Sequence, residues 1–210
     1  MQELRKEYTQ RGLAEHEVAP DPITQFQRWF EAAAGAGMRE PNAMTLATVG
    51  ADGQPSARIV LLKDFDANGF VFFTNYASRK GGELDASGAA ALVFYWPELE
   101  RQVRVEGSVA RVDAAESDAY YAVRPEGSRL GAWASPQSQV ISGRPELEAR
   151  LAEVTARFAD GAPTRPPDWG GYRVAHTLVE FWQGRPSRLH DRIRYRRGPD
   201  GAWLIERLAP

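Results

Sequence analysis

The chain has 210 residues, 43% of them hydrophobic and 26% charged, a composition typical of a globular domain and not of a disordered or fibrous chain. The absence of cysteine excludes disulfides and thiolate chemistry, and a net charge of −2 gives no overall attraction to nucleic acid. The longest apolar run, residues 89–96, is too short to span a membrane, and the charged N-terminus lacks the apolar core of a secretory signal, so we expect a cytoplasmic protein.

The start of the chain predicts an arm followed by a helix. Residues 1–20 are polar with little periodicity, so we expect a flexible N-terminal arm, and residues 21–210 are expected to form a single domain. Asp21 and Pro22 predict a helix start, because Asp caps helix N-termini and Pro fits the first turn. Gly35 and Gly37 predict its end.

From residue 44 onward, short β-branched and aromatic runs alternate with turn residues. They predict strands at 44–49, 57–65, 70–75, 89–96 and 101–112, with Asp52-Gly53 and Asn68-Gly69 as hairpin turns. A short helix capped by Ser78 and ended by Gly88 is expected between the third and fourth strands.

The second half of the chain predicts helices and then closing strands. Helices are expected at 115–125, 128–133 and 145–160, followed by two or three strands within 172–182 and 192–208. An apolar stripe on the last helix is expected to belong to the core; it consists of Leu147, Leu151, Val154 and Phe158.

Strands joined by hairpins, with helices inserted between them, favour a mainly β fold: an antiparallel barrel-like core with flanking helices. No G-x-G-x-x-G follows a strand and no G-x-x-x-x-G-K-[ST] occurs, which disfavours a Rossmann or P-loop fold.

Without a glycine-rich cradle, a bound phosphate needs basic and hydroxyl side chains from several elements. Arg58 and Lys63 bracket one strand, and Arg79 and Lys80 lie at a helix start, where unpaired N–H groups favour an anion. Other polar candidates are Thr74, the strand amide Gln102, and the helically spaced Tyr120, Arg124 and Ser128. Taken alone, the basic pair and the amide are more often solvated surface, and Arg124 fits a structural role at a helix C-terminus.

The densest cluster lies near the C-terminus, where Trp182 precedes Arg188, His190 and Arg192. Alternation predicts that these last three share one strand face, where they repel one another unless an anion or a carboxylate offsets them. A ligand phosphate or an electron-rich ring is one interpretation, and a solvated basic face is the other. His16 and His176 are remote from His190 in sequence, which argues against a metal site.

Six segments occur together and in order from about Leu4 to Pro210: RIVLLK, TNYASRKGGEL, ERQVRVEG, RPEGSRLGAWASPQSQVIS, VEFWQG and RLHDR. This set closely resembles the pyridoxine/pyridoxamine 5'-phosphate oxidase family. The resemblance implies an antiparallel FMN-binding split β-barrel that works as a homodimer with two flavins at the interface. It also implies a small-molecule reaction: oxidation of pyridoxine 5'-phosphate and pyridoxamine 5'-phosphate to pyridoxal 5'-phosphate, with O2 as acceptor and H2O2 as product.

The same resemblance implies which residues contact FMN: Arg58, Ile59, Val60, Leu61, Leu62, Lys63, Phe73, Thr74, Arg79, Lys80, Gln102, Gln137, Ser138, Trp182 and Arg192. Four of them are expected at the flavin phosphate, namely Arg58, Arg79, Lys80 and Ser138. The site is expected to combine Arg58 and Lys80 of one chain with Gln137, Trp182 and Arg192 of the other.

The resemblance also implies the substrate site. Lys63, Tyr120, Arg124 and Ser128 are expected to grip the substrate phosphate. Arg188 and His190, the expected catalytic residues, hold the pyridine ring with Leu189 between them, and Arg5, Lys6, Glu7 and Tyr8 are expected to close over it.

Four residues differ from the family's frequent choices: Phe73 for Tyr, Arg129 for Gln, Gln139 for Ser and Lys6 for Arg. The alternatives to the oxidase are a phenazine-type flavin oxidase of the same fold and a non-catalytic flavin- or heme-binding module. A nucleic-acid binder is argued only by the basic C-terminal cluster, and the net charge counts against it. We expect neither nucleic-acid nor membrane partners.

Overall fold

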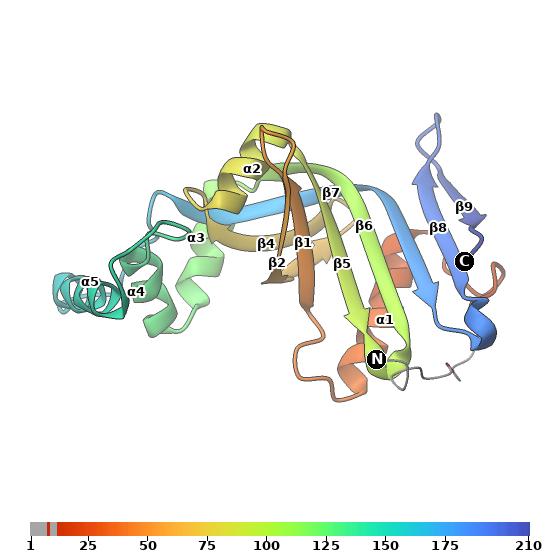
Figure 1. Ribbon diagram of the computed structural model, residues 1–210, viewed down its shortest axis with the longest axis horizontal. Helices are drawn as coiled ribbons and strands as arrows, with labels where there is room; N and C mark the ends of the chain where they lie inside the picture. Colours follow the sequence, from red (N-terminus) through yellow and green to blue (C-terminus); the bar gives the residue numbers. More distant parts are fainter. Residues whose placement is uncertain (1–7, 9–11) are drawn as a thin grey trace.

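The computed structural model describes Tyr8 and residues 12–210, which form one twisted sheet flanked by helices (Figure 1). The strands are β1 (Ala43–Val49), β2 (Pro55–Leu61), β3 (Asp64–Asp66), β4 (Gly69–Asn75), β5 (Ala89–Trp96), β6 (Arg101–Arg111), β7 (Trp169–Gln183), β8 (Asp191–Arg197) and β9 (Trp203–Arg207). The helices are α1 (Pro22–Gly35), α2 (Arg79–Ser87), α3 (Ala114–Val123), α4 (Glu126–Ala134) and α5 (Arg144–Arg157).

The sheet runs in the order β2-β1-β5-β6-β7-β4-β3, and the strand pairs are antiparallel. The long strand β7 pairs with β4 through residues 169–174 and with β8 through residues 178–183, so the sheet divides halfway along it. One end of β7 lies beside α3 and the other beside the β8–β9 hairpin (Figure 1). The predicted mainly β, antiparallel architecture with flanking helices is confirmed.

Helix α1 lies over the sheet and supplies the centre of the core. Asp21 caps it by accepting from the backbone N–H groups of Ile23 and Thr24 at 3.0 and 2.8 Å, as predicted. Phe26 is fully buried, and its ring lies 4.9 Å from the ring centroids of Phe65, Phe70 and Phe94. Such aromatic contacts bury large apolar areas and hold the helix on the barrel.

Turn residues behave as the sequence predicts. Gly53 and Gly69 take positive φ in the β1–β2 and β3–β4 turns, and Gly88 ends α2 in the left-handed region after Ser78 has capped its start. At Gly69 there is a second requirement, because an added Cβ would lie 2.1 Å from the carbonyl oxygen of Val174. A side chain there would force β4 and β7 apart.

Two predictions about the secondary structure and core are wrong. The single strand expected at 57–65 is two strands, β2 and β3, because the chain turns at Leu62, whose side chain is buried in the core. The apolar stripe of α5 is not core: α5 has no buried residue and Leu151 is 40% exposed. This helix lies outside the barrel and packs against α4, where Phe158 meets Trp133 with ring centroids 5.6 Å apart.

Part of the predicted N-terminal arm is docked on the sheet. Leu13 and Ala19 are buried. The backbone N–H of Leu13 donates to Asp191, and the Tyr195 hydroxyl donates to the carbonyl of Ala19. The flexibility predicted for residues 1–20 remains a prediction for the rest of the arm. In the described part of the chain, no helix is long and apolar enough to cross a membrane.

His176 of β7 is a buried histidine whose Nδ1 has no hydrogen-bond partner among the described residues. Its ring stacks on Trp203, with centroids 5.4 Å apart and planes 5° from parallel. Burial, with a smaller contribution from the charge of Arg197, lowers the pKa of His176 to about 4. The folded protein therefore holds this imidazole neutral at pH values where the unfolded chain protonates it.

We expect His176 to make stability depend on pH. Its contribution to the free energy of unfolding is complete above about pH 6.5, the pKa in the unfolded chain. That contribution is lost as the pH falls toward 4, because over this range only the unfolded chain gains the proton. Between pH 6.5 and 5 this amounts to about 1.5 kcal/mol. His176→Gln should remove that slope from the free energy of unfolding measured in urea, and parallel curves for both proteins would contradict the expectation.

Candidate functional site

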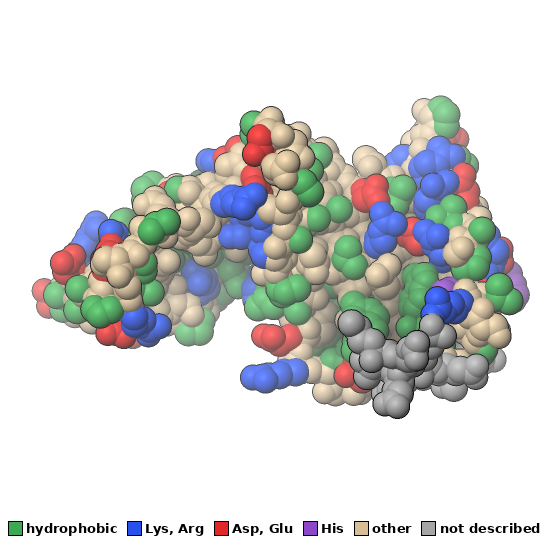
Figure 2. Space-filling view, viewed as in Figure 1, with side chains coloured by type: hydrophobic (Ala, Val, Ile, Leu, Met, Phe, Trp, Pro, Cys, Tyr) green, Lys and Arg blue, Asp and Glu red, His purple; other side chains and the backbone are tan. Residues whose placement is uncertain are grey.

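A cavity of about 580 Å³ opens where β2, β4, α2, α3 and α4 meet. It brings together most of the residues predicted for flavin and substrate phosphate: Arg58, Ile59, Val60, Leu61, Lys63, Phe73, Thr74, Lys80, Tyr120, Arg124, Ser128 and Gln137. Its volume is in the range of small-molecule sites. Figure 2 shows a hollow between the helices on the left and the sheet, with basic side chains at its upper edge.

The charge of the cavity has one sign. Arg58, Lys63, Lys80 and Arg124 line it, and none of its described lining residues is acidic. Burial and then the neighbouring Arg58 charge lower the pKa of Lys80, and burial lowers the pKa of Arg124. Cations that are crowded and partly desolvated in this way gain from a bound anion, which is the chemistry that a phosphate supplies.

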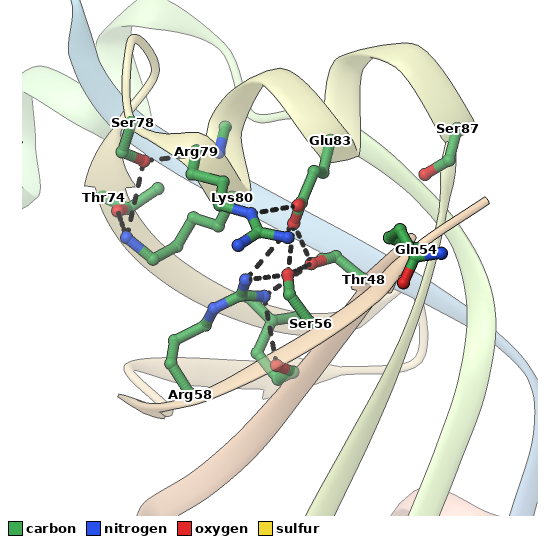
Figure 3. A network of polar contacts seen from close by, with 12 residues as sticks. Thr48, Gln54, Ser56, Arg58, Thr74, Ser78, Arg79, Lys80, Glu83 and Ser87 are labelled. Atoms are coloured by element: carbon green, nitrogen blue, oxygen red, sulfur yellow. Dashed lines mark hydrogen bonds and ion pairs between the residues drawn. The ribbon is translucent and has the colours of Figure 1, made fainter. Parts of the chain in front are cut away.

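Arg58 is held from behind by Glu83 of α2 (Figure 3). Its Nη1 donates to Thr48 and to the carbonyl of Leu46, and its Nη2 donates to Ser56 and Glu83. Hydrogen bonds from Ser56 and Thr48 lower the pKa of the buried Glu83 to about 2, so this carboxylate stays ionised. Arg58 is therefore anchored in the wall, with both terminal nitrogens occupied.

Lys80 reaches the cavity from the first turn of α2. Its Nζ donates to Gln137 at 2.7 Å and to Thr74 at 3.2 Å, and Thr74 in turn donates to Gln137 at 3.1 Å. The prediction that Gln137 comes from the other chain is wrong, because this amide closes the cavity beside Lys80 of its own chain. The loop after α4 brings it there, a contact across 57 residues that spacing alone does not indicate.

Three aromatic rings form one wall of the cavity. Phe73 stacks on Tyr120, with centroids 4.0 Å apart, and on Trp169 at 5.5 Å, and Tyr120 and Trp169 are 10° from parallel. An added Cβ at Gly171 would lie 2.8 Å from the Phe73 ring, so glycine leaves room for the stack. The stack is built of packed rings, so the missing Tyr hydroxyl at Phe73 does not disrupt it.

Arg124 differs from Arg58 in its surroundings. Its guanidinium lies over the Trp169 ring, 4.6 Å from the centroid. Its Nη1 is buried and has no hydrogen-bond partner in the described part of the chain. A buried donor without a partner is costly, and a ligand anion satisfies it.

A second group of predicted residues lies on β6, β7 and the start of β8. Tyr8, Trp182 and His190 form an aromatic cluster, with ring centroids 5.6, 5.5 and 4.7 Å apart. The backbone N–H of Arg185 donates to Nδ1 of His190, and burial and the Arg188 charge lower the pKa of His190. Of the stretch expected to close over the substrate, only Tyr8 is described, and Arg5, Lys6 and Glu7 lie outside the described residues.

The predicted alternation of Arg188, His190 and Arg192 on one strand face is wrong. Pro186–Arg188 is a 3₁₀ turn in which Ser187 and Arg188 take positive φ, and the strand begins only at Asp191. Arg188 and Leu189 are exposed, whereas Arg192 lies in the ladder opposite Trp182, which itself pairs with Gln102.

Carboxylates of the same chain offset part of the basic C-terminal cluster. The buried Glu180 pairs with Arg192 at 2.7 Å and raises its pKa, Glu206 pairs with Arg194 and Arg196, and Asp191 lies 3.6 Å from Arg185. These ion pairs offset part of the charge of the cluster within the described chain.

Within one chain the two groups lie far apart. Trp169 begins β7 at the cavity, whereas Trp182 lies near the other end of the same strand. Thirteen residues of extended strand separate them by about 40 Å. None of Gln102, Trp182, Arg188, Leu189, His190 and Arg192 is among the described residues that line the cavity.

Three further predicted flavin residues are not among those that line the cavity. Leu62 is buried in the core, Arg79 is ion-paired with Glu83 at 2.7 Å, and Ser138 is exposed with φ of +72°. Conversely, Val123, Pro125 and Trp169 line the cavity and were not predicted. Trp169 follows a proline-rich loop, and only the β4–β7 pairing brings it to Phe73.

Family models match nearly the whole chain. The model described as pyridoxamine 5'-phosphate oxidase matches residues 30–158, and the one described as the pyridoxine 5'-phosphate oxidase C-terminal dimerisation region matches residues 169–210. A Cupriavidus metallidurans protein named pyridoxine/pyridoxamine 5'-phosphate oxidase is 64% identical, covering 99% of this chain and 98% of its own. A Pseudomonas paraeruginosa protein of the same name is 60% identical, covering 99% and 97%.

Solved structures agree on the fold. PhzG from Burkholderia lata, determined in complex with tetrahydrophenazine-1-carboxylic acid, is 34% identical with a TM-score of 0.89, covering 96% of this chain and 99% of its own. An FMN-binding, pyridoxamine 5'-phosphate oxidase-related protein from Nostoc punctiforme is 19% identical with a TM-score of 0.72, covering 92% and 100%. These similarities confirm the predicted split-barrel fold. With both family models and full-length relatives in agreement, the chain belongs to the pyridoxine/pyridoxamine 5'-phosphate oxidase family.

Proposed function

We propose that the protein is an FMN-dependent oxidase that converts pyridoxine 5'-phosphate and pyridoxamine 5'-phosphate to pyridoxal 5'-phosphate, with O2 as acceptor and H2O2 as product. The observation that carries the proposal is the cavity with four basic side chains, an aromatic wall and no acidic lining residue among those described. Such a site suits a flat aromatic ligand that bears a phosphate dianion. The full-length relatives of the same name support the same substrate class.

The residues present fit two phosphate-bearing ligands. Lys80, at the start of α2 with Thr74 and Gln137, is suited to hold the phosphate of FMN, and Arg58 supports it from the wall. Tyr120, Arg124 and Ser128, on α3, α4 and the turn between them, are suited to hold the phosphate of the substrate together with Lys63, whose Nζ lies 5.9 Å from the Tyr120 ring centroid.

Bound FMN supplies two-electron oxidation chemistry, and the side chains bind and orient the reactants. We propose that Arg188 and His190 position the pyridine ring. The lowered pKa of His190 favours the neutral imidazole, and because Nδ1 accepts from the Arg185 N–H, Nε2–H is the donor left for the substrate, with no second positive charge beside Arg188. Because these residues lie remote from the cavity of their own chain, the proposal requires a homodimer in which one chain's second group completes its partner's cavity. The match to a dimerisation region supports this arrangement.

The test is direct. The purified protein should bind FMN with a flavin absorbance spectrum and release H2O2 when given pyridoxine 5'-phosphate or pyridoxamine 5'-phosphate. A protein that cannot be loaded with FMN contradicts the proposal. A loaded protein that oxidises only a phenazine precursor replaces it with the phenazine-type alternative, and one that turns over neither substrate class is a flavin-binding module.

A further inference from the structure

We propose that Trp169 is a positioning residue that fixes the plane of the Arg124 guanidinium for recognition of the substrate phosphate. This inference rests on the proposed function, since it concerns the same cavity. It starts from a contrast between the two arginines that line that cavity, Arg58 and Arg124.

The two arginines are held by different means. Arg58 is fixed through its edges, because both terminal nitrogens donate to oxygen atoms of neighbouring residues and one of these is the carboxylate of Glu83. Those hydrogen bonds use the N–H groups that a phosphate would need, and the carboxylate offsets the charge. An arginine held in this way stabilises the wall more than it recognises an anion.

Arg124 lies over an aromatic ring instead. The guanidinium lies 4.6 Å from the centroid of Trp169 and 5.9 Å from that of Tyr121, and the described residues provide neither a hydrogen bond nor an ion pair to its side chain. Stacking on an aromatic ring orients the plane of a guanidinium and leaves its edge N–H groups free. Arg124 therefore lines the cavity with a guanidinium whose charge no carboxylate of the described residues offsets.

Trp169 is itself held rigidly. Its side chain is 6% exposed, and its ring lies in the stack with Phe73 and Tyr120, with planes 14° and 10° from parallel. The backbone of Trp169 is paired with Asn75 at the start of β7. One side chain thus sets the position of Arg124 and borders Tyr120, which also lines the cavity.

The inference predicts a specific kinetic change. Trp169→Leu keeps an apolar side chain but removes the ring face, so Arg124 loses its fixed plane. We expect KM for pyridoxine 5'-phosphate to rise about tenfold, with kcat and the Kd for FMN changed less than about twofold. Trp169→Phe retains a ring face and should restore KM to within about threefold of the wild-type value.

A matched control is available in the same chain. Trp133 carries Arg157 at 4.5 Å, nearly the same geometry, but neither residue lines the cavity. Trp133→Leu should leave KM unchanged. Calorimetric binding of inorganic phosphate to the flavin-loaded variants gives a readout that does not depend on turnover, and Trp169→Leu should weaken it by a similar factor.

The outcomes separate this inference from the proposed function. Unchanged KM and phosphate affinity in Trp169→Leu overturn the positioning role, and so does an equal loss of flavin, which would show a structural role. If Trp169→Leu does not fold, wild-type behaviour of Arg124→Ala in the phosphate titration overturns it. If the wild-type protein oxidises neither substrate, the proposed function fails, while the phosphate titration still tests the inference.

Discussion

Replacing Arg124 by alanine is expected to raise KM for pyridoxine 5'-phosphate by about 10–150-fold, the range that corresponds to losing one charged hydrogen bond of about 1.5–3 kcal/mol. The reason is structural: Arg124 lines the cavity, and the described residues give its side chain neither a hydrogen bond nor an ion pair, so its charge is available to the substrate phosphate. Bound FMN should remain stoichiometric, because Lys80 and Gln137 are untouched.

Two controls make this prediction specific. Arg157→Ala removes a guanidinium stacked on tryptophan outside the cavity and should leave KM unchanged. Unphosphorylated pyridoxine, which has no dianion to grip, should be turned over equally poorly by the wild type and by Arg124→Ala. If Arg124→Ala loses flavin in proportion to activity, Arg124 contacts the phosphate of FMN instead.

Local chemistry accounts for much of the fold that the sequence predicted. The cap at Asp21, the turn at Asn68-Gly69 and the end of α2 at Gly88 depend on a few neighbouring residues, and each occurs as expected. The stripe on α5 was misassigned because a period of 3.6 shows that a helix is amphipathic and not which surface covers it. The alternation in residues 188–192 failed because a 3₁₀ turn with two positive φ values interrupts the extended backbone.

The site was predictable as a set of residues and not as an arrangement. The resemblance supplied the members, but the placement of Gln137 beside Lys80 depends on a loop that returns from α4, and no periodicity encodes that contact. Arg58 is anchored and Arg124 is not because the fold brings a carboxylate only to Arg58 among the described residues. Glu83 reaches Arg58 because α2 packs over β1, the neighbour of β2. No sequence motif indicates that Trp169 lines the cavity.

Separating the subunits is expected to abolish flavin binding and activity together. In one chain the cavity and the group that contains Trp182, Arg188 and His190 lie at opposite ends of β7, so neither end can serve the other. The edge strand β2 also leaves Ile59 65% exposed at the cavity, an apolar surface that a second subunit would cover. Activity that follows the dimer fraction on dilution, measured with sedimentation velocity on the same samples, would agree with this.

Mixing two inactive proteins tests the shared site more sharply. One double variant, Lys80→Ala with Arg124→Ala, damages the cavity, and the other, Arg188→Met with His190→Asn, damages the second group. If each site combines the cavity of one subunit with the second group of the other, every mixed dimer has one intact site and one doubly damaged site. Random reassociation of equal amounts makes half of the dimers mixed, so the mixture should recover roughly a quarter of the wild-type activity. If each site were built from a single chain, mixing would restore nothing, because every chain carries one of the two defects. Recovery of activity in the mixture, with neither variant active alone, therefore decides whether the second subunit completes the site.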